Sequence, residues 1–173
     1  TVLVQQDAGT ELWKMGLPTE HPYCFEADPG VIYEACVRIT TAASTEPKLG
    51  STVYWHPRVL WVGIGCERGT SHTLIEHGVT SVFREHGLAI EAIAGVATLD
   101  LKADEAGLLE FSTTHQWPLS YFAPEDLKDC PVPHPSEVVE TAVGTPSVAE
   151  AGALRAAARV APGLAEADQS PTL

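Results

Sequence analysis

The chain has 173 residues, of which 10 are Lys or Arg and 23 are Asp or Glu, so its formal net charge is −13. That acidity argues against nucleic acid or an anionic membrane surface as a partner, because both are bound through clustered Lys and Arg side chains. No apolar run approaches the roughly 20 residues of a membrane-spanning helix, and no signal peptide is visible. The four cysteines are scattered without a C-x-x-C pair, which predicts a reducing, cytoplasmic compartment and no zinc knuckle.

Residues 1–52 are predicted to form a small strand-containing segment that ends in a linker. Val2–Val4 is one short strand, Gly9–Gly16 is a turn or short helix, and Val31–Thr40 is a second strand. The polar stretch Thr41–Ser51 is interpreted as a loop. Because the chain begins without Met and directly in a strand-like run, we expect it to be part of a longer polypeptide.

Residues 53–160 alternate apolar runs with helical patterns, which predicts an α/β fold: a three-layer α/β/α domain with a mainly parallel sheet. The expected strands are Val59–Val62, Ile93–Leu99 and Trp117–Phe122. The expected helices are Ser71–His86, Asp104–His115, a short turn at Pro124–Asp129, Ser136–Val143, and an Ala-rich helix from Thr145 to about Ala158. Residues 161–173 are predicted to be a tail.

The start of the Ala-rich helix has two competing signals. Thr145 followed by Pro146 is typical of an N-cap with Pro at the first helical position. Ser147 and Glu150 have the spacing of a capping box, which would start the helix two residues later.

The most informative stretch is the glycine-containing loop after the first of these strands. Gly63, Gly65 and Gly69 have the spacing G-x-G-x-x-x-G, one residue longer than that of a dinucleotide-binding loop. The segment Arg68-Gly69-Thr70 also lacks the Gly-Lys-Ser/Thr of a P-loop. A strand, a glycine loop and a helix still present backbone N–H groups at a helix N-terminus, where anions bind. The alternative is that the glycines only form a tight turn.

Three loops are expected to converge where parallel strands end: residues 63–71, residues 100–105, and residues 133–137 together with 144–147. The first and third supply the candidate ligand-binding residues, which are Gly63, Gly65, Cys66, Glu67, Arg68, Gly69, Thr70, Ser71, Ser136, Thr145 and Ser147. The second supplies the candidate catalytic residues Asp100, Lys102 and Glu105. A carboxylate could move a proton, and the lysine could stabilise a developing oxyanion.

Each candidate also has a plainer interpretation. Asp100 could cap a turn and Lys102 could be an ordinary surface lysine. Ser136 and Thr145 could serve only as helix N-caps. Cys66 could be a small buried apolar residue, although a position before a helix N-terminus favours a reactive thiolate. Three histidines, His72, His77 and His86, are expected on one helix, and the other four are dispersed. No metal-binding triad is visible, so structural or surface roles are expected for them.

Taken together, the segments GIGCERGTS (63–71), ATLDLKADEAGLL (97–109) and PSEVVETAVGTPSVAEA (135–151) resemble, in order and spacing, the C-terminal domain of the CbiG/CobE family of cobalamin-biosynthesis proteins. The resemblance covers residues 58 to about 157, and the segment before it resembles the central region of CbiG proteins. It divides the chain into part of that central region with a linker (1–52), the C-terminal domain (53–160) and a tail (161–173). The sequence departs from the family at His134, where Asn is usual, and lacks the family's closing Lys-Gln-containing strand.

The resemblance implies a fragment of a cobalt-precorrin 5A hydrolase, which opens a δ-lactone on the tetrapyrrole ring and releases acetaldehyde. The alternative is a non-catalytic, CobE-like domain that binds or carries corrinoid intermediates. The acetate and propionate arms of a tetrapyrrole would suit helix N-termini. No protein-bound cofactor is implied, because the cobalt belongs to the substrate. Expected partners are a cobalt-precorrin or other corrinoid intermediate, a fused or neighbouring precorrin methyltransferase, and a second copy of the chain.

Overall fold

The computed structural model describes residues 1–44 and 51–166, so parts of the predicted loop at 41–51 and of the predicted tail lie outside the described residues. The chain divides into two compact units. The N-terminal unit comprises residues 1–59 and 81–92, and the C-terminal unit comprises residues 60–80 and those from 93 onward. Each unit has its own parallel sheet and is described by itself.

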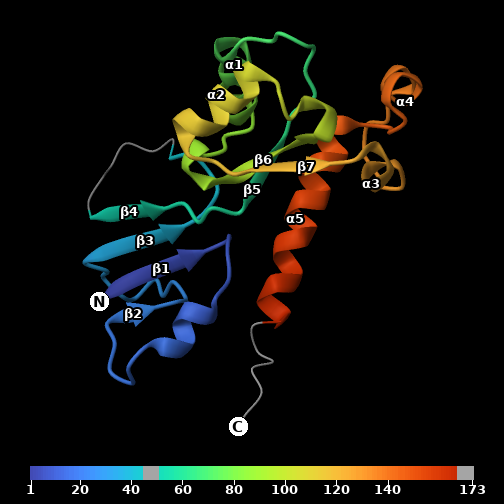
Figure 1. Cartoon of the computed structure of the whole chain (residues 1–173). Helices are drawn as coiled ribbons and strands as arrows, with labels where there is room; N and C mark the ends of the chain where they lie inside the picture. The colour runs from blue at the N-terminus through green and yellow to red at the C-terminus, as the bar shows by residue number, and fades with distance from the viewer. Residues whose placement is uncertain (45–50, 167–173) are drawn as a thin grey trace. The chain divides into compact units, whose positions relative to one another are not determined.

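The N-terminal unit is built on a four-stranded sheet in the order β2-β1-β3-β4 (Figure 1). Its strands are β1 (Val2–Gln6), β2 (Tyr23–Cys24), β3 (Ala35–Ile39) and β4 (Thr52–Trp55), and every ladder between them is parallel. A 3-10 helix at Leu12–Gly16 confirms the predicted turn or short helix. The strands β2 and β4 were not predicted, because two and four residues are too few to show a clear alternation.

Strand β3 begins four residues later than the predicted strand 31–40. The residues before it form a turn in which the Asp28 carboxylate accepts a hydrogen bond from the Gly30 N–H at 2.8 Å. The Tyr33 hydroxyl accepts another from the Asp28 N–H, also at 2.8 Å. These local bonds satisfy backbone groups that a strand would otherwise pair, so Ile32 stays 93 % exposed despite its strand propensity.

The described residues form five α-helices: α1 (His72–Glu85), α2 (Ala106–His115), α3 (Pro124–Lys128), α4 (Glu137–Val143) and α5 (Val148–Glu166). The end of α1 belongs to the N-terminal unit, whereas the C-terminal unit contains the last four helices and α1 up to residue 80. Its strands β5 (Leu60–Gly63), β6 (Ile93–Leu99) and β7 (Leu119–Phe122) form a parallel sheet in the order β5-β6-β7. Figure 1 shows α2 and the start of α1 on one face of this sheet and α5 on the other. This arrangement confirms the predicted three-layer α/β/α fold with a parallel sheet.

Small side chains bring α5 close to the sheet. Ala151 and Ala156 are buried in the core of this unit beside Ala97 of the central strand, and Gly152 also faces Ala97. The helix packs on β5 and β6 and continues to Glu166, eight residues beyond the end expected from the sequence at Ala158. Helix α2 begins two residues later than expected, because Asp100–Lys102 forms a separate 3-10 turn.

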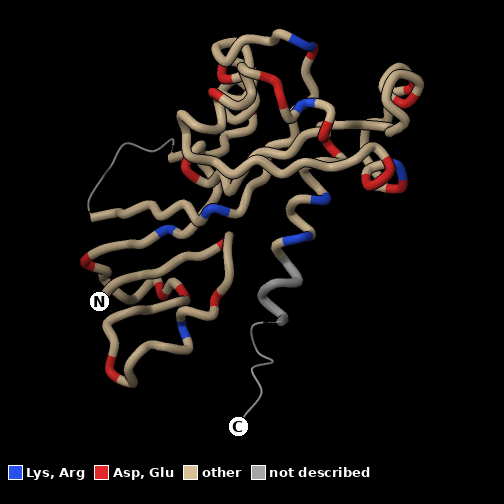
Figure 2. The backbone as a smooth tube through the Cα atoms, viewed as in Figure 1, with Lys and Arg blue, Asp and Glu red and all other residues tan. Residues whose placement is uncertain are grey.

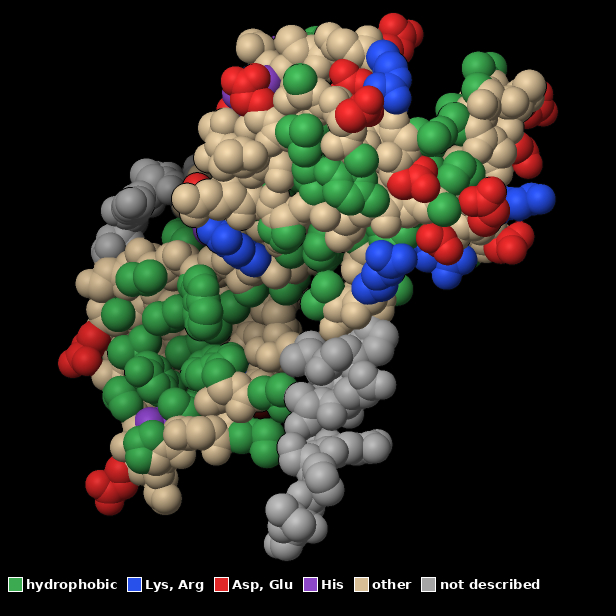
Figure 3. Space-filling view, in the orientation of Figure 1, with side chains coloured by type: hydrophobic (Ala, Val, Ile, Leu, Met, Phe, Trp, Pro, Cys, Tyr) green, Lys and Arg blue, Asp and Glu red, His purple; other side chains and the backbone are tan. Residues whose placement is uncertain are grey.

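Asp and Glu residues occur along both units, whereas Lys and Arg residues are few (Figure 2). In the face drawn in Figure 3, hydrophobic side chains gather over the sheet of the N-terminal unit. Exposed large hydrophobic residues of this unit include Met15, Val53 and Trp55. Within the described ranges, no helix is both long and apolar enough to cross a bilayer.

Candidate functional site

Two of the predicted loops meet at the carboxyl end of the sheet in the C-terminal unit. Residues 64–71 connect β5 to α1, and residues 100–105 connect β6 to α2. A Cβ atom at Gly107, in the first turn of α2, would lie 2.9 Å from the backbone nitrogen of His72 and nearer still to the carbonyl oxygen of Thr70. Only glycine at 107 therefore lets the first turns of α1 and α2 approach this closely.

Glu105 fastens the two loops together. Its side chain is only 6 % exposed, and Oε1 accepts a hydrogen bond from the Gly69 N–H at 2.6 Å. Gly69 has a φ of +77°, which glycine adopts without strain. Oε2 is buried and has no hydrogen-bond partner among the described residues, and it lies 3.9 Å from both Arg68 Nη1 and Lys102 Nζ. Because buried carboxylate oxygens are rarely left unpartnered, Oε2 marks a candidate functional group.

Arg68 links the same loops from an exposed position. Its Nη1 donates to Asp104 Oδ1 at 2.9 Å, and its Nη2 donates to the Leu101 carbonyl oxygen at 2.9 Å. The hydrogen bond between the two side chains raises the pKa of the Arg68 guanidinium and lowers the pKa of the Asp104 carboxyl. The guanidinium therefore has partners within the protein, although its side chain is still 63 % exposed to an approaching ligand.

The three candidate catalytic residues occupy different environments. Lys102 is 17 % exposed and lies 3.9 Å from the buried Glu105 carboxylate, so it is not an ordinary surface lysine. Asp100 is exposed where β6 ends, and its carbonyl oxygen accepts a hydrogen bond from the Ala103 N–H at 3.0 Å. The fold thus places Glu105 and Lys102 side by side and leaves Asp100 at the surface.

The start of α5 also reaches the glycine loop. A Cβ atom at Gly63 would lie 2.6 Å from the carbonyl carbon of Ala149 and nearer still to its oxygen. A Cβ atom at Gly65 would lie in ordinary contact with Val148, 3.4 Å from its Cβ. The helix N-termini of α1, α2 and α5 are therefore all adjacent to the loop that follows β5.

Ser136 and Ser147 are helix N-caps. For Ser136 this is the plainer of its two predicted roles, and for Ser147 it agrees with the later of the two predicted starts of the Ala-rich helix. Ser136 Oγ accepts from the Val139 N–H at 3.4 Å, and Ser147 Oγ accepts from the Glu150 N–H at 3.2 Å. The predicted N-cap role of Thr145 is wrong, because Ser147 caps α5. Thr145 is fully buried instead, and its hydroxyl donates to the Ser147 carbonyl oxygen at 3.5 Å.

The Glu150 side chain does not complete a capping box but binds His134. Its carboxylate accepts from the His134 backbone N–H at 3.0 Å and contacts the His134 Nδ1 at 2.7 Å. The backbone hydrogen bond, and then the one to the ring, lower the pKa of the Glu150 carboxyl. A backbone hydrogen bond of 2.8 Å from Ser136 N–H to the Pro146 carbonyl oxygen joins the two ends of this segment.

The remaining polar side chains of the glycine loop shape the loop itself. Thr70 Oγ1 donates to the Glu67 carbonyl oxygen at 2.7 Å, and Ser71 Oγ accepts from the Leu74 N–H at 3.3 Å. Cys66 is a half-buried free thiol. Their role in binding a ligand stays a prediction.

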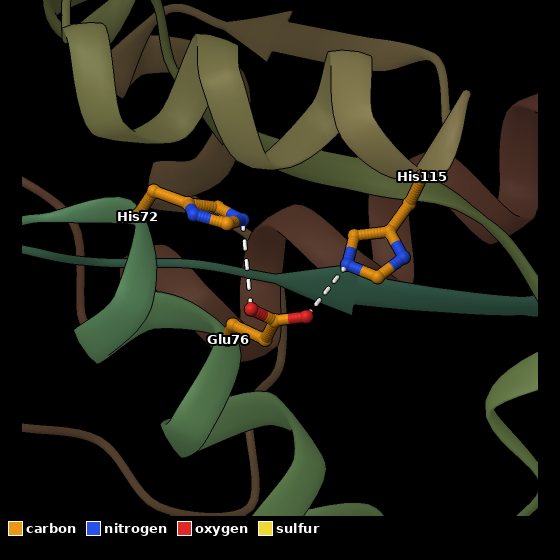
Figure 4. Close-up of side chains that lie close together, drawn as sticks. All are labelled: His72, Glu76 and His115. Atoms are coloured by element: carbon orange, nitrogen blue, oxygen red, sulfur yellow. Dashed lines mark hydrogen bonds and ion pairs between the residues drawn. The ribbon is translucent and has the colours of Figure 1, made fainter.

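The structure also brings together three side chains that the sequence did not single out as a group. His72 and Glu76 lie on α1, and His115 ends α2 (Figure 4). Their ligand atoms lie within 4.8 Å of one another, as a metal site would require. The spacing of His72 and Glu76 at i and i+4 was a usable signal, but the approach of His115 depends on the packing of two helices.

Comparison with known proteins identifies the family. Residues 60–168 match the family model described as cobalamin synthesis G C-terminus. The chain is 33% identical over 109 residues to a cobalt-precorrin-5A hydrolase from Priestia megaterium, across 63% of this chain but only 29% of that protein. It is similar to the crystal structure of CobE, a protein from the cobalamin (vitamin B12) biosynthetic pathway, with 35% identity, a TM-score of 0.58, and coverage of 61% of this chain and 76% of that one. Because the family model matches more than half of its residues, the chain belongs to the family of the cobalamin synthesis G C-terminal domain.

Proposed function

We propose that this chain is the C-terminal part of a cobalt-precorrin-5A hydrolase and that its converging loops bind the corrinoid substrate. The observation that carries the proposal is the buried carboxylate of Glu105, which has one oxygen fixed by Gly69 and the other without a partner in the described part of the chain. The alignment with the Priestia megaterium hydrolase covers the segment that contains it.

The acid arms of a tetrapyrrole would be held at the loop cluster by backbone and side-chain donors. The N-termini of α1, α2 and α5 carry partial positive charge, which favours carboxylates within the first turn. Arg68 adds an exposed guanidinium that can hydrogen-bond a carboxylate while Asp104 holds one of its edges. This local arrangement offsets the repulsion expected between an acidic protein and an acidic ligand.

Lactone opening would use Glu105 as the general base. Oε2 would take a proton from a water molecule as its oxygen adds to the lactone carbonyl. Lys102, 3.9 Å from this oxygen, would stabilise the negative charge that develops on the carbonyl oxygen. The ring C–O bond would then break, and the proton held by Glu105 would pass to the departing alkoxide. Water and lactone together give a hydroxy acid, and Glu105 is regenerated. Cleavage of the bond between the ring and the carbon that carries the new hydroxyl group, with the hydroxyl proton passing to the ring carbon, would then release acetaldehyde.

A second candidate function is binding of a corrinoid intermediate without catalysis. It is favoured by the internal use of the polar groups, because Glu105 and Arg68 both bind parts of the loops themselves. The likeness to CobE over 76% of that chain also fits this alternative.

A single-turnover experiment separates the two functions. The full-length protein that contains this chain is mixed with cobalt-precorrin 5A, and the acetaldehyde released is measured. Glu105→Gln is expected to bind the substrate normally and to react about 100- to 10,000-fold more slowly. Glu110→Gln, a change at an exposed glutamate on the helix that follows Glu105, serves as the control. If Glu105→Gln binds and turns over normally, the catalytic base lies elsewhere in the full-length protein and this chain has the second function, which is binding alone. If no variant of the residues in loops 64–71 and 100–105 loses binding or turnover, both functions are contradicted.

A further inference from the structure

A second polar cluster lies on the helical layer of the C-terminal unit. Figure 4 shows the Glu76 carboxylate between two imidazole rings, with one oxygen directed to each. His115 Nε2 lies 3.2 Å from Glu76 Oε1, and His72 Nε2 lies 3.6 Å from Glu76 Oε2. The first distance is that of a hydrogen bond, whereas the second is longer than a hydrogen bond allows.

The His72 ring has a buried nitrogen whose contact with Glu76 is longer than a hydrogen bond. Its Nε2 is buried and has no hydrogen-bond partner among the described residues. Buried polar atoms in native proteins nearly always have a partner, from the protein or from something bound to it. The cluster is also reachable from solvent, because the side chains of His72, Glu76 and His115 are 19%, 42% and 26% exposed.

We propose that His72, Glu76 and His115 form a binding site for a divalent transition-metal ion, with Zn²⁺ as the reference ion. An ion about 2.0–2.1 Å from each ligand in a tetrahedron has ligand atoms about 3.3 Å apart. The 3.2 Å separation of His115 Nε2 from Glu76 Oε1 is close to that value. With one ligand atom taken from each residue, all three ligand atoms lie within 4.8 Å of one another.

The composition of the cluster indicates which ions it selects. Two imidazoles and one carboxylate favour Zn²⁺, Co²⁺, Ni²⁺ or Cu²⁺ over Mg²⁺ and Ca²⁺, which prefer oxygen ligands. Three protein ligands leave a coordination position for water, as in zinc sites that are not fully closed by protein side chains. This inference is independent of the proposed function, because that function uses the side chains of Glu105, Lys102 and Arg68 and none of these three side chains.

Aromatic packing holds one of the ligands in place. The His115 ring stacks on Trp117 with a centroid distance of 4.2 Å and an angle of 10°, and it meets Phe111 edge-on at 5.1 Å. A ring fixed by its neighbours loses little freedom when it binds a metal ion, which favours affinity. The alternative is that the cluster is only a hydrogen-bonded link between α1 and α2.

Metal titration of the tag-free full chain tests the proposal. Zn²⁺ binding is measured by competition with a chromophoric chelator, and Co²⁺ binding by visible absorption. The variants are Glu76→Gln and His115→Gln, which keep side-chain size and hydrogen-bonding capacity. His77→Gln, at an exposed position next on the same helix, is the matched control. Loss of groups around a metal ligand typically weakens binding about 10- to 100-fold, so loss of a ligand itself should weaken it at least as much.

The expected result is one ion per chain in the wild type and the control, with affinity reduced at least about tenfold in both ligand variants. Equal affinity in all four proteins, or no uptake by the wild type, overturns the proposal. If a variant fails to fold, an NMR experiment on the wild-type protein still tests the proposal. On Zn²⁺ addition, the imidazole in NOE contact with the Trp117 indole must change its ¹⁵N signals, and an unchanged spectrum for that ring refutes the site.

Discussion

Removal of the Glu105 side chain should loosen the glycine loop without unfolding the domain. Glu105→Ala deletes the 2.6 Å hydrogen bond that the buried Glu105 carboxylate accepts from the Gly69 N–H. A hydrogen bond to a charged group contributes about 1.5–3 kcal/mol. The two ion pairs at 3.9 Å add little, because Arg68 is largely exposed and the distances exceed hydrogen-bond range.

Two further effects on the unfolding free energy of Glu105→Ala oppose each other. The Ala variant leaves a small void, which destabilises the protein further, but it also removes a buried carboxylate oxygen that has no partner within the described residues. We therefore expect unfolding free energy to fall by about 2 kcal/mol, a decrease in Tm of roughly 4–8 °C for a chain of this size. Glu105→Gln should lose less, because its amide oxygen can still accept from the Gly69 N–H.

The assay combines thermal unfolding with amide hydrogen exchange. The Gly69 amide should exchange faster in Glu105→Ala than in the wild type, while exchange in the central strand β6 stays slow. An unchanged Gly69 rate in the Ala variant, or an equal loss of stability in the Gln and Ala variants, would refute the argument that this hydrogen bond fixes the loop.

Two other changes test the contacts around the same loops. Gly63→Ala should lower the unfolding free energy by about 1–3 kcal/mol or more, because its Cβ would collide with the Ala149 backbone. Gly78→Ala, where a Cβ meets open space, is the control and should be neutral or stabilising. Urea unfolding measures both. The pKa of Asp104 is lowered by Arg68, so the stability from this pair is present above the carboxyl's unfolded pKa and lost as pH falls through the folded one. NMR titration of Arg68→Gln should move the pKa of Asp104 upward, and an unmoved value would exclude Arg68 as its cause.

Much of the C-terminal unit follows from sequence pattern alone. The strand β6 has seven residues with six of them buried, so its continuous apolar run gave a strong signal. The ends of α4 were marked by Ser136 and by Gly144, which has a φ of +79°. Such signals can be found from the sequence because the capping groups bind backbone groups only a few residues away.

The errors arise where distant parts of the chain decide the outcome. Thr145 has the residue type and the following proline of an N-cap, but its side chain is fully buried, and Ser147 caps the helix instead. The ligand-binding role of Arg68 stays a prediction, but its internal partners Asp104 and Leu101 lie more than 30 residues away and could not be found from a local pattern. The contact of His115 with Glu76 spans 39 residues, so no local pattern could have shown it.

The junction of Gly107, Glu105 and Gly69 has a consequence for the thermodynamics of ligand binding. With α2 seated against the Thr70–His72 backbone, the loop has few conformations left to sample in the free protein. Ordering a mobile residue costs about 1–2 kcal/mol of conformational entropy, and a loop that is already ordered avoids that cost when a ligand arrives. Enthalpy and solvent release would then dominate binding, and affinity could change through exposed side chains such as Arg68 while the loop conformation stays the same.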